Sequence, residues 1–280
     1  MKKNCLVKKK CVWIILKKLY KKVMRDDIFA VASQLAYNLI LSFFPFMIFL
    51  LTLIGASNLN QQGVLEVLKM FLPTTAYDLI YSTIEEVFMV QQKGNLLWLS
   101  IALAIWTSSS GFRAVIHGIN KAYEESEKRS YVKVVILSIL CTIILAMLII
   151  VTLFLLVFGD LIGKYLLSKL PFDDAIMFGW DMSRYIVLVS MMIVTFAALY
   201  YFAPCKKLAW FEVIPGAVFT TLGWIGTAYL FSFYVNNFGN YSRFYGSLGA
   251  VFMLMTWLFL SSVILLLGGE INAVLVRNDI

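Results

Sequence analysis

The chain has 280 residues, of which 61% are hydrophobic and 14% are charged, and its mean hydropathy is +0.84. Soluble domains average about 25% charged residues, so this composition excludes a soluble globular domain. It also excludes a disordered chain, because disordered segments are poor in apolar and aromatic residues. The formal net charge is +8, and ten of the 24 basic residues lie within the first 25 positions. Such a cluster before an apolar span predicts a cytoplasmic flank in contact with membrane lipids, and it argues against nucleic acid as a partner.

Residues 1–27 form the first predicted unit, a basic amphipathic segment in the cytoplasm. Apolar side chains recur there at helical spacing and lysines occupy the other face, which predicts a helix lying on the inner membrane surface. A solvated charged tail is the alternative. The apolar residues are Val12, Leu16, Leu19, Tyr20 and Val23, and the lysines are Lys17, Lys18, Lys21 and Lys22.

Residues 28–275 form the second unit, an all-α integral membrane domain with six transmembrane helices, because a span needs about 20 mainly apolar residues. The predicted spans are 28–55, 95–112, 134–159, 185–203, 213–235 and 244–269. Segments on the N-terminal side of the membrane then hold 18 basic residues, and the opposite segments hold 6. The positive-inside rule therefore places both termini, including the short tail 276–280, in the cytoplasm.

The first outer loop, residues 56–94, has a helical pattern of its own. Thr74 or Thr75 is a suitable N-cap, and an apolar stripe follows from Leu79 to Phe88. We expect one or two amphipathic helices on the outer face. Whether they bind a partner stays open.

The first span carries Gln34, Asn38 and Ser42, spaced four residues apart on one helix face, with Pro45 one turn further on. Proline removes a backbone hydrogen bond, so we expect a kink there. The functional interpretation is a polar, substrate-binding groove for a head group or an ion. The alternative is hydrogen bonding between helices, which is common for Asn and Gln in membrane bundles.

The second span ends with Ser109, Arg113 and His117 at the same spacing. If the helix continues, these residues form a second candidate substrate-binding face at the cytoplasmic end, where a guanidinium suits a phosphate or a carboxylate. An arginine that only extends to the interface is the alternative. Glu270 lies at a similar predicted depth on the sixth span, so we expect an Arg113–Glu270 ion pair.

Small residues on the last two spans predict close helix packing. They are Gly216, Thr220, Gly223 and Thr227 on the fifth span, and Gly246 and Ala250 at the start of the sixth.

The sequence has a single histidine and lacks the HExxH, GxxxxGK[ST] and GxSxG motifs. We therefore expect no metal site, no cofactor and no enzymatic activity.

Three stretches resemble the YihY/BrkB family of bacterial inner-membrane proteins. They are ASQLAYN at 32–38 with LSFFP at 41–45, WTSSSGFRA at 106–114 with NKAY at 120–123, and YGSLGAV at 245–251 with GEINA at 269–273. With PGA at 215–217, the similarity covers nearly the whole chain. The resemblance implies six spans and a bacterial plasma-membrane location. Members have been labelled ribonuclease BN, a tRNA-processing enzyme, or virulence factors. RNA hydrolysis needs placed metals or acid/base groups, which argues against the nuclease label for this chain.

These observations favour a non-enzymatic transporter of an amphipathic or anionic substrate, with a lipid as one candidate. A structural or assembly protein of the cell envelope is the alternative. A cation/proton exchanger ranks third, because no acidic residue falls near the middle of a predicted span. The substrate, and a homo-oligomer or an envelope partner, stay open.

Overall fold

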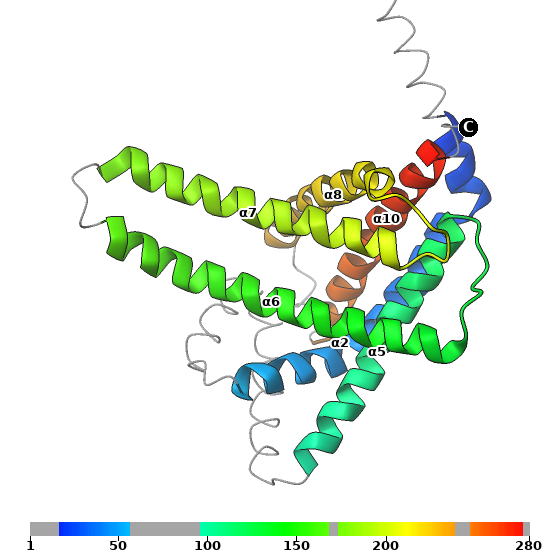
Figure 1. Cartoon of the computed structure of the whole chain (residues 1–280), viewed down its shortest axis with the longest axis horizontal. Helices are drawn as coiled ribbons and strands as arrows, with labels where there is room; N and C mark the ends of the chain where they lie inside the picture. Colours follow the sequence, from blue (N-terminus) through cyan, green and yellow to red (C-terminus); the bar gives the residue numbers. More distant parts are fainter. Residues whose placement is uncertain (1–16, 57–95, 168–172, 239–246, 277–280) are drawn as a thin grey trace, which may run out of the picture.

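A computed structural model describes residues 17–56, 96–167, 173–238 and 247–276, and these residues form helices and short connections without a strand. A short helix, 17–25, precedes six long ones (Figure 1). The long helices are α2 (Ile28–Ala56), α5 (Leu96–Ala122), α6 (Tyr131–Leu167), α7 (Asp173–Phe202), α8 (Trp210–Phe238) and α10 (Ser247–Val276). The predicted outer-loop helices lie outside the described residues.

Four helices contain stretches long and apolar enough to cross a bilayer: Tyr131–Thr152, Tyr185–Phe202, Trp210–Val235 and Val251–Val276. The described apolar stretch of α2, Ile28–Phe43, is shorter. The all-helical architecture is confirmed, whereas the number of six spans stays a prediction. The long helices extend past several predicted boundaries. In particular, α5 continues through 112 to Ala122, which places Ser109, Arg113 and His117 on one helix.

The six long helices pack in a cyclic order, α5–α2–α10–α8–α7–α6, and the last helix returns to the first. The contact between α6 and α7 is the least extensive in this ring, and α10 also touches α5. Helices α6 and α7 run antiparallel (Figure 1). Pro45 lies inside α2, and Figure 1 shows this helix changing direction along its length, as the backbone hydrogen bond missing at a proline permits.

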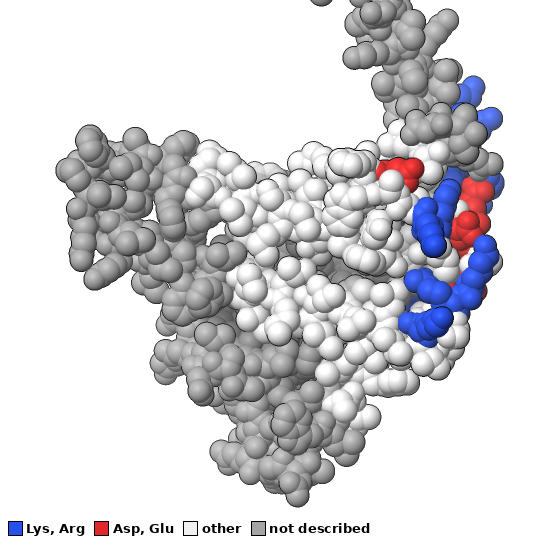
Figure 2. Space-filling view, in the orientation of Figure 1, with Lys and Arg blue, Asp and Glu red and all other residues white. Residues whose placement is uncertain are grey.

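Of the residues that Figure 2 colours by charge, the Lys, Arg, Asp and Glu side chains gather at one end of the molecule. At this end the helix 17–25, the end of α5 and the connections 123–130 and 203–209 meet (Figure 1). We call residues 17–27, 120–130 and 203–209 the charged end.

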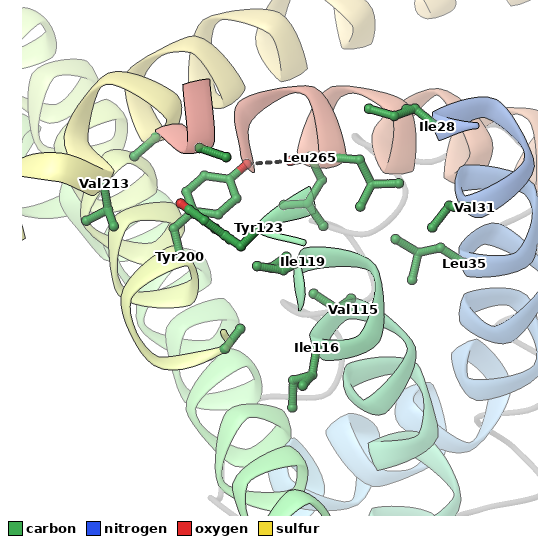
Figure 3. Packing of buried hydrophobic residues seen from close by; sticks show 14 of the residues in the cluster. Ile28, Val31, Leu35, Val115, Ile116, Ile119, Tyr123, Tyr200, Val213 and Leu265 are labelled. Atoms are coloured by element: carbon green, nitrogen blue, oxygen red, sulfur yellow. Dashed lines mark hydrogen bonds between the residues drawn. The ribbon is translucent and has the colours of Figure 1, made fainter. Parts of the chain in front are cut away.

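The buried apolar core lies beside the charged end. It joins Val31 and Leu35 of α2 and Ile116 and Ile119 of α5 to residues of α7, α8 and α10 (Figure 3). Elsewhere large apolar side chains are exposed along the helices, for example Leu230, which is 68% exposed. An apolar perimeter around a packed interior suits a lipid environment.

Small residues allow the close approach of neighbouring helices. A Cβ added to Gly111 of α5 would lie 2.5 Å from the Oγ of Ser42, so this glycine fixes the α2–α5 contact. On α8, Gly216 lies against the backbone of Gly268 and the side chain of Asn272, and Gly223 lies against Ile264 of α10. Thr220 is buried and Thr227 is half-buried. Gly246 lies outside the described residues, and the side chain of Ala250 is not described.

We predict that Gly216→Ala destabilises the protein by about 1–3 kcal/mol, because the added methyl group would overlap the Gly268 carbonyl oxygen and the Asn272 amide. The matched control is Gly226→Ala on the same helix, where an added Cβ meets nothing within 4 Å. This variant should be neutral or slightly stabilised, since alanine favours helix over glycine. Thermal unfolding in detergent measures both, and equal shifts in Tm would contradict the packing argument.

Candidate functional site

Arg113 of α5 is the first candidate site residue, and its side chain is half-buried. Its Nη1 donates a hydrogen bond to the Oγ of Ser109 at 2.7 Å, and its guanidinium lies 5.9 Å from the centroid of the Trp106 ring. Ser109 is fully buried and donates to the Trp106 carbonyl at 2.7 Å, so its hydroxyl oxygen is presented to the arginine. The guanidinium is thus oriented by its own helix. None of the ion pairs among the described residues involves Arg113.

Arg113 lies deeper than the charged end. It comes nine residues before Ala122, the last residue of α5, which is about 13 Å along the helix axis. Helical side chains point back towards the N-terminus, and the contact with Trp106, seven residues earlier, follows this direction. The guanidinium therefore lies among apolar helices and not at the mouth of the bundle.

Among the described residues, the polar side chains of α2 share no hydrogen bond with Arg113. Gln34 is exposed, Asn38 donates to the Gln34 carbonyl at 2.8 Å, and buried Ser42 donates to the Leu39 carbonyl at 3.0 Å. The side-chain hydrogen bonds of Asn38 and Ser42 are therefore made within their own helix.

The helical wheel of α5 explains why the two predicted faces do not meet. Gly111 faces α2, and Ser109 and Arg113 are each two residues away from it, about 200° around the helix. His117 is exposed one turn beyond Arg113. The structure thus keeps Ser109 and Arg113 together and separates them from Ser42.

The predicted ion pair between Arg113 and Glu270 is wrong, because Glu270 pairs with Lys22. The Lys22 Nζ donates to the Glu270 carboxylate and to the Ala122 carbonyl, and to the Asp26 carboxylate at 3.0 Å. Glu270 is therefore level with the end of α5, well above Arg113. The sequence pattern predicts Lys22 on the exposed polar face of the N-terminal helix. The structure buries its side chain instead, to 9% exposure.

The end of α5 explains why a lysine is needed at this place. The amide of Glu124 donates to the Lys121 carbonyl and the amide of Glu125 donates to the Asn120 carbonyl, both at 2.9 Å, which is the Schellman pattern. Glu124 takes the left-handed conformation usual for glycine there, with φ of 57°. The Ala122 carbonyl is left without an amide partner of this kind, and Lys22 supplies the donor. The positive charge also complements the helix dipole.

Arg25 extends the same network by donating to Glu124 and, at 2.9 Å, to Asp26. Partial burial opposes ionisation of Asp26, but hydrogen bonds from Arg25 and Lys22 outweigh it and lower the pKa of this carboxyl. Five charged groups from three parts of the chain therefore form one cluster, which we call the Lys22 cluster: Lys22, Arg25, Asp26, Glu124 and Glu270.

A second charged cluster joins the two connections of the charged end. Arg129 donates through Nε and Nη2 to both oxygens of Glu127, at 2.8 and 2.9 Å, and through Nη2 to the Ala203 carbonyl at 2.7 Å. Asn120 donates to Glu127 at 2.9 Å and accepts from the Cys205 amide at 2.8 Å. The ends of α5 and α7 and the start of α6 are held together by these bonds.

Two buried polar side chains connect α7, α8 and α10. The Tyr200 hydroxyl donates to the Leu265 carbonyl at 2.6 Å and lies 2.6 Å from the Thr220 hydroxyl, so Thr220 is the donor in that pair. The Asn272 amide accepts from the Gly216 amide at 2.6 Å and donates to the Val213 carbonyl at 3.1 Å, on either side of Pro215, which has no amide hydrogen. Sequence reasoning missed both residues, because a lone Tyr or Asn in an apolar span gives no spacing signal.

The described residues contain no group of three or more His, Cys, Asp or Glu side chains that could hold a metal ion. The charged groups described above contact one another instead.

Comparison with known proteins assigns the chain to a family. The sequence model of the virulence factor BrkB family matches residues 19–279. The chain belongs to this family. The ribonuclease-like protein YfkH of Bacillus subtilis (strain 168) is 40% identical over 260 residues, which cover 93% of this chain and 94% of the relative. A UPF0761 membrane protein of Psychromonas ingrahamii is 27% identical over 265 residues, covering 90% and 84%. No solved structure matches. The family match, the UPF0761 membrane-protein relatives and the apolar helices together indicate a membrane protein.

The Glu127–Arg129 pair predicts acid sensitivity at the charged end. Hydrogen bonds from Arg129 lower the pKa of Glu127 from 4.5 to about 2. A carboxyl with a depressed pKa stabilises the fold above its unfolded pKa, and this contribution is lost as the pH falls from about 4.5 to about 2. We expect the Tm in detergent to fall across this window.

Glu127→Gln should show a shallower fall in Tm, because glutamine binds no proton, although its Tm at neutral pH should be lower. Glu125→Gln is the matched control, since Glu125 makes a surface pair with Lys128. It should keep the steep fall, and equal slopes for all three proteins would contradict the assignment.

Proposed function

We propose that this protein is a non-enzymatic transporter that moves an amphipathic anionic substrate, such as a phospholipid, across the bacterial plasma membrane. It would cross the membrane six times, with both termini in the cytoplasm. Membrane lipids are then its partners, and nucleic acid is not.

The charged end supports this orientation. Its three segments hold ten Lys and Arg residues, and all ten belong to the segments predicted to lie on the inner side. The positive-inside rule makes this side cytoplasmic. Exposed apolar side chains cover the helices away from this end, as expected for contact with lipid tails.

Arg113 is the observation that carries the proposal. A charged residue inside a membrane domain is costly, so such a residue usually has a partner or a function. Within the part of the chain that the structure describes, one of five guanidinium N–H donors is used, by Ser109, and no carboxylate pairs with it. The remaining donors suit a phosphate or a carboxylate, which arginine binds with two parallel hydrogen bonds.

The surface next to Arg113 favours an amphipathic substrate. Trp106 lies on the same side of α5, two turns further from the charged end, and is 48% exposed. Leu103, one turn beyond it, is 55% exposed. An acyl chain lying along these residues would place its head group at the guanidinium.

The name of the Bacillus relative refers to ribonuclease. We propose that this chain lacks ribonuclease activity. The carboxylates of Asp26, Glu124, Glu127 and Glu270 are engaged in ion pairs with basic side chains. Incubation of the purified protein with precursor tRNA provides the test, and cleavage that depends on the protein would overturn this part of the proposal.

Lipid movement in proteoliposomes tests the transport proposal. We expect head-group-labelled phospholipid to cross faster than in empty vesicles. Arg113→Ala should slow it by about tenfold or more, because hydrogen bonds to charged groups contribute about 1.5–3 kcal/mol. Arg113→Lys should recover only part of the rate, since an ammonium cannot bind two oxygens in parallel.

Lys121→Gln is the matched control, because it removes a positive charge from an exposed position of the same helix. It should leave the rate unchanged. No movement of any common phospholipid, or equal rates for Arg113→Ala and the wild type, would overturn the proposal. Loss of folding instead of transport in Arg113→Ala would favour the envelope scaffold.

A further inference from the structure

The helix 17–25 is attached to the bundle through the charged groups of the Lys22 cluster and through Val23, which packs against the apolar core. Its Tyr20 is 64% exposed and its Met24 is 52% exposed, and Leu19 and Val23 are only half-buried. Lys22 is the one residue of this segment that is buried. An element with so little buried apolar area is among the first parts of a structure to open locally.

A turn separates this helix from α2. Asp27, the residue before α2, has φ of 48°, a left-handed conformation that is uncommon for non-glycine residues, although aspartate adopts it more readily than most. Such a conformation persists only where the surroundings hold it. In the residues just before Asp27, Lys22 binds Glu270 and Arg25 binds Glu124. A change of conformation at Asp27 would therefore release the helix as one piece.

The contacts of Lys22 join two helices that are not neighbours in the ring. Glu270 belongs to α10 and the Ala122 carbonyl belongs to α5, and α2 lies between these helices in the packing order. At the charged end, the lysine therefore connects α5 to α10 across the start of α2. The same helix binds the α5 cap a second time through Arg25 and Glu124.

We propose that residues 17–25 form a latch that holds the ends of α5 and α10 together, with Asp27 as its hinge and the Lys22–Glu270 pair as its lock. Releasing the pair leaves the ends of α5 and α10 held by their direct packing alone, as where Gly269 lies against Ala122, so that these ends separate more easily and open the charged end of the ring. The role of this opening in transport rests on the function proposed above, whereas the latch itself does not. In a transporter, the route from Arg113 to the charged end would be closed while the latch is bound and open when it is released.

A distance measurement tests the latch without any transport assay. Spin labels on Tyr20→Cys and Phe211→Cys, in a protein whose native cysteines are replaced by serine, report the separation of the helix 17–25 from the start of α8. Both positions are exposed, Phe211 to 82%. In the wild type we expect one short distance. In Lys22→Met and in Glu270→Gln we expect a second, longer population above the roughly 10% that a minor state usually reaches.

The matched control is Lys21→Met, which removes a neighbouring charge from an exposed position of the same helix. It should keep the wild-type distances. The double variant Lys22→Met, Glu270→Gln should open no further than the single variants, because both changes remove the same pair. Folded variants with the wild-type distance distribution would overturn the latch.

Chemical locking covers the case in which these variants fail to fold. Lys22→Cys with Glu270→Cys replaces the ion pair by two thiols, which a short bifunctional thiol reagent joins reversibly. Joining the thiols should stop lipid movement in proteoliposomes, and a reductant should restore it. Equal lipid movement above that of empty vesicles in the joined and the reduced protein would overturn the role of the latch in transport. If the distances change as expected and no variant moves lipid, the transport proposal fails and the latch stands.

Discussion

The bilayer constrains this structure more than any single contact, because an apolar solvent offers no partner to a polar group. The hydroxyl groups of the long helices meet this demand locally. Ser138, Thr142, Ser190, Thr195 and Thr256 all donate to the carbonyl four residues earlier in the same helix. Such a bond satisfies the hydroxyl donor within its own helix, so the hydroxyl needs no partner on another helix. These five hydroxyls therefore add little to the specificity of helix packing, unlike the hydroxyls of Tyr200 and Thr220, which join two helices.

Specific contacts between helices come from three other sources. Glycines let the backbones approach at Gly111, Gly216 and Gly268. Tyr200 and Asn272 reach across to backbone groups of other helices. The charges are concentrated at one end, where Lys22 and Arg129 each bind a carboxylate together with a free helix or loop carbonyl. The charged contacts are stabilising at this end because water is near, and partial hydration lowers the free-energy cost of burying a charge.

The sequence predicts those features of the fold that depend on the composition of a continuous segment. Apolar stretches locate the helices, and small residues spaced three or four apart on α8 mark a face that lies against α10. The contacts of Lys22, Glu270 and Asn272 depend on which helix ends are level, and no pattern within a segment encodes this. Arg113 and Glu270 illustrate the difference. Both lie near the predicted inner ends of their spans, yet α5 continues nine residues beyond Arg113, so the arginine is too deep to meet the carboxylate. A signal for Lys22 did exist in its spacing of four residues from Asp26, but it could not identify Glu270.

The different surroundings of Lys22 and Arg113 suggest different roles for the two cations. Lys22 is buried and has two carboxylates and a carbonyl as partners, so its charge is fully used within the protein. Arg113 is half-buried, with one serine and one aromatic ring as partners. A lysine bound in this way stabilises one arrangement of the helices, and its removal should change shape more than affinity. An arginine bound in this way retains hydrogen-bonding capacity for an anion from outside the chain, and its removal should change affinity more than shape. The two sites lie about 13 Å apart along α5, so in the proposed transporter the place that holds the anion is separate from the place that controls access to it.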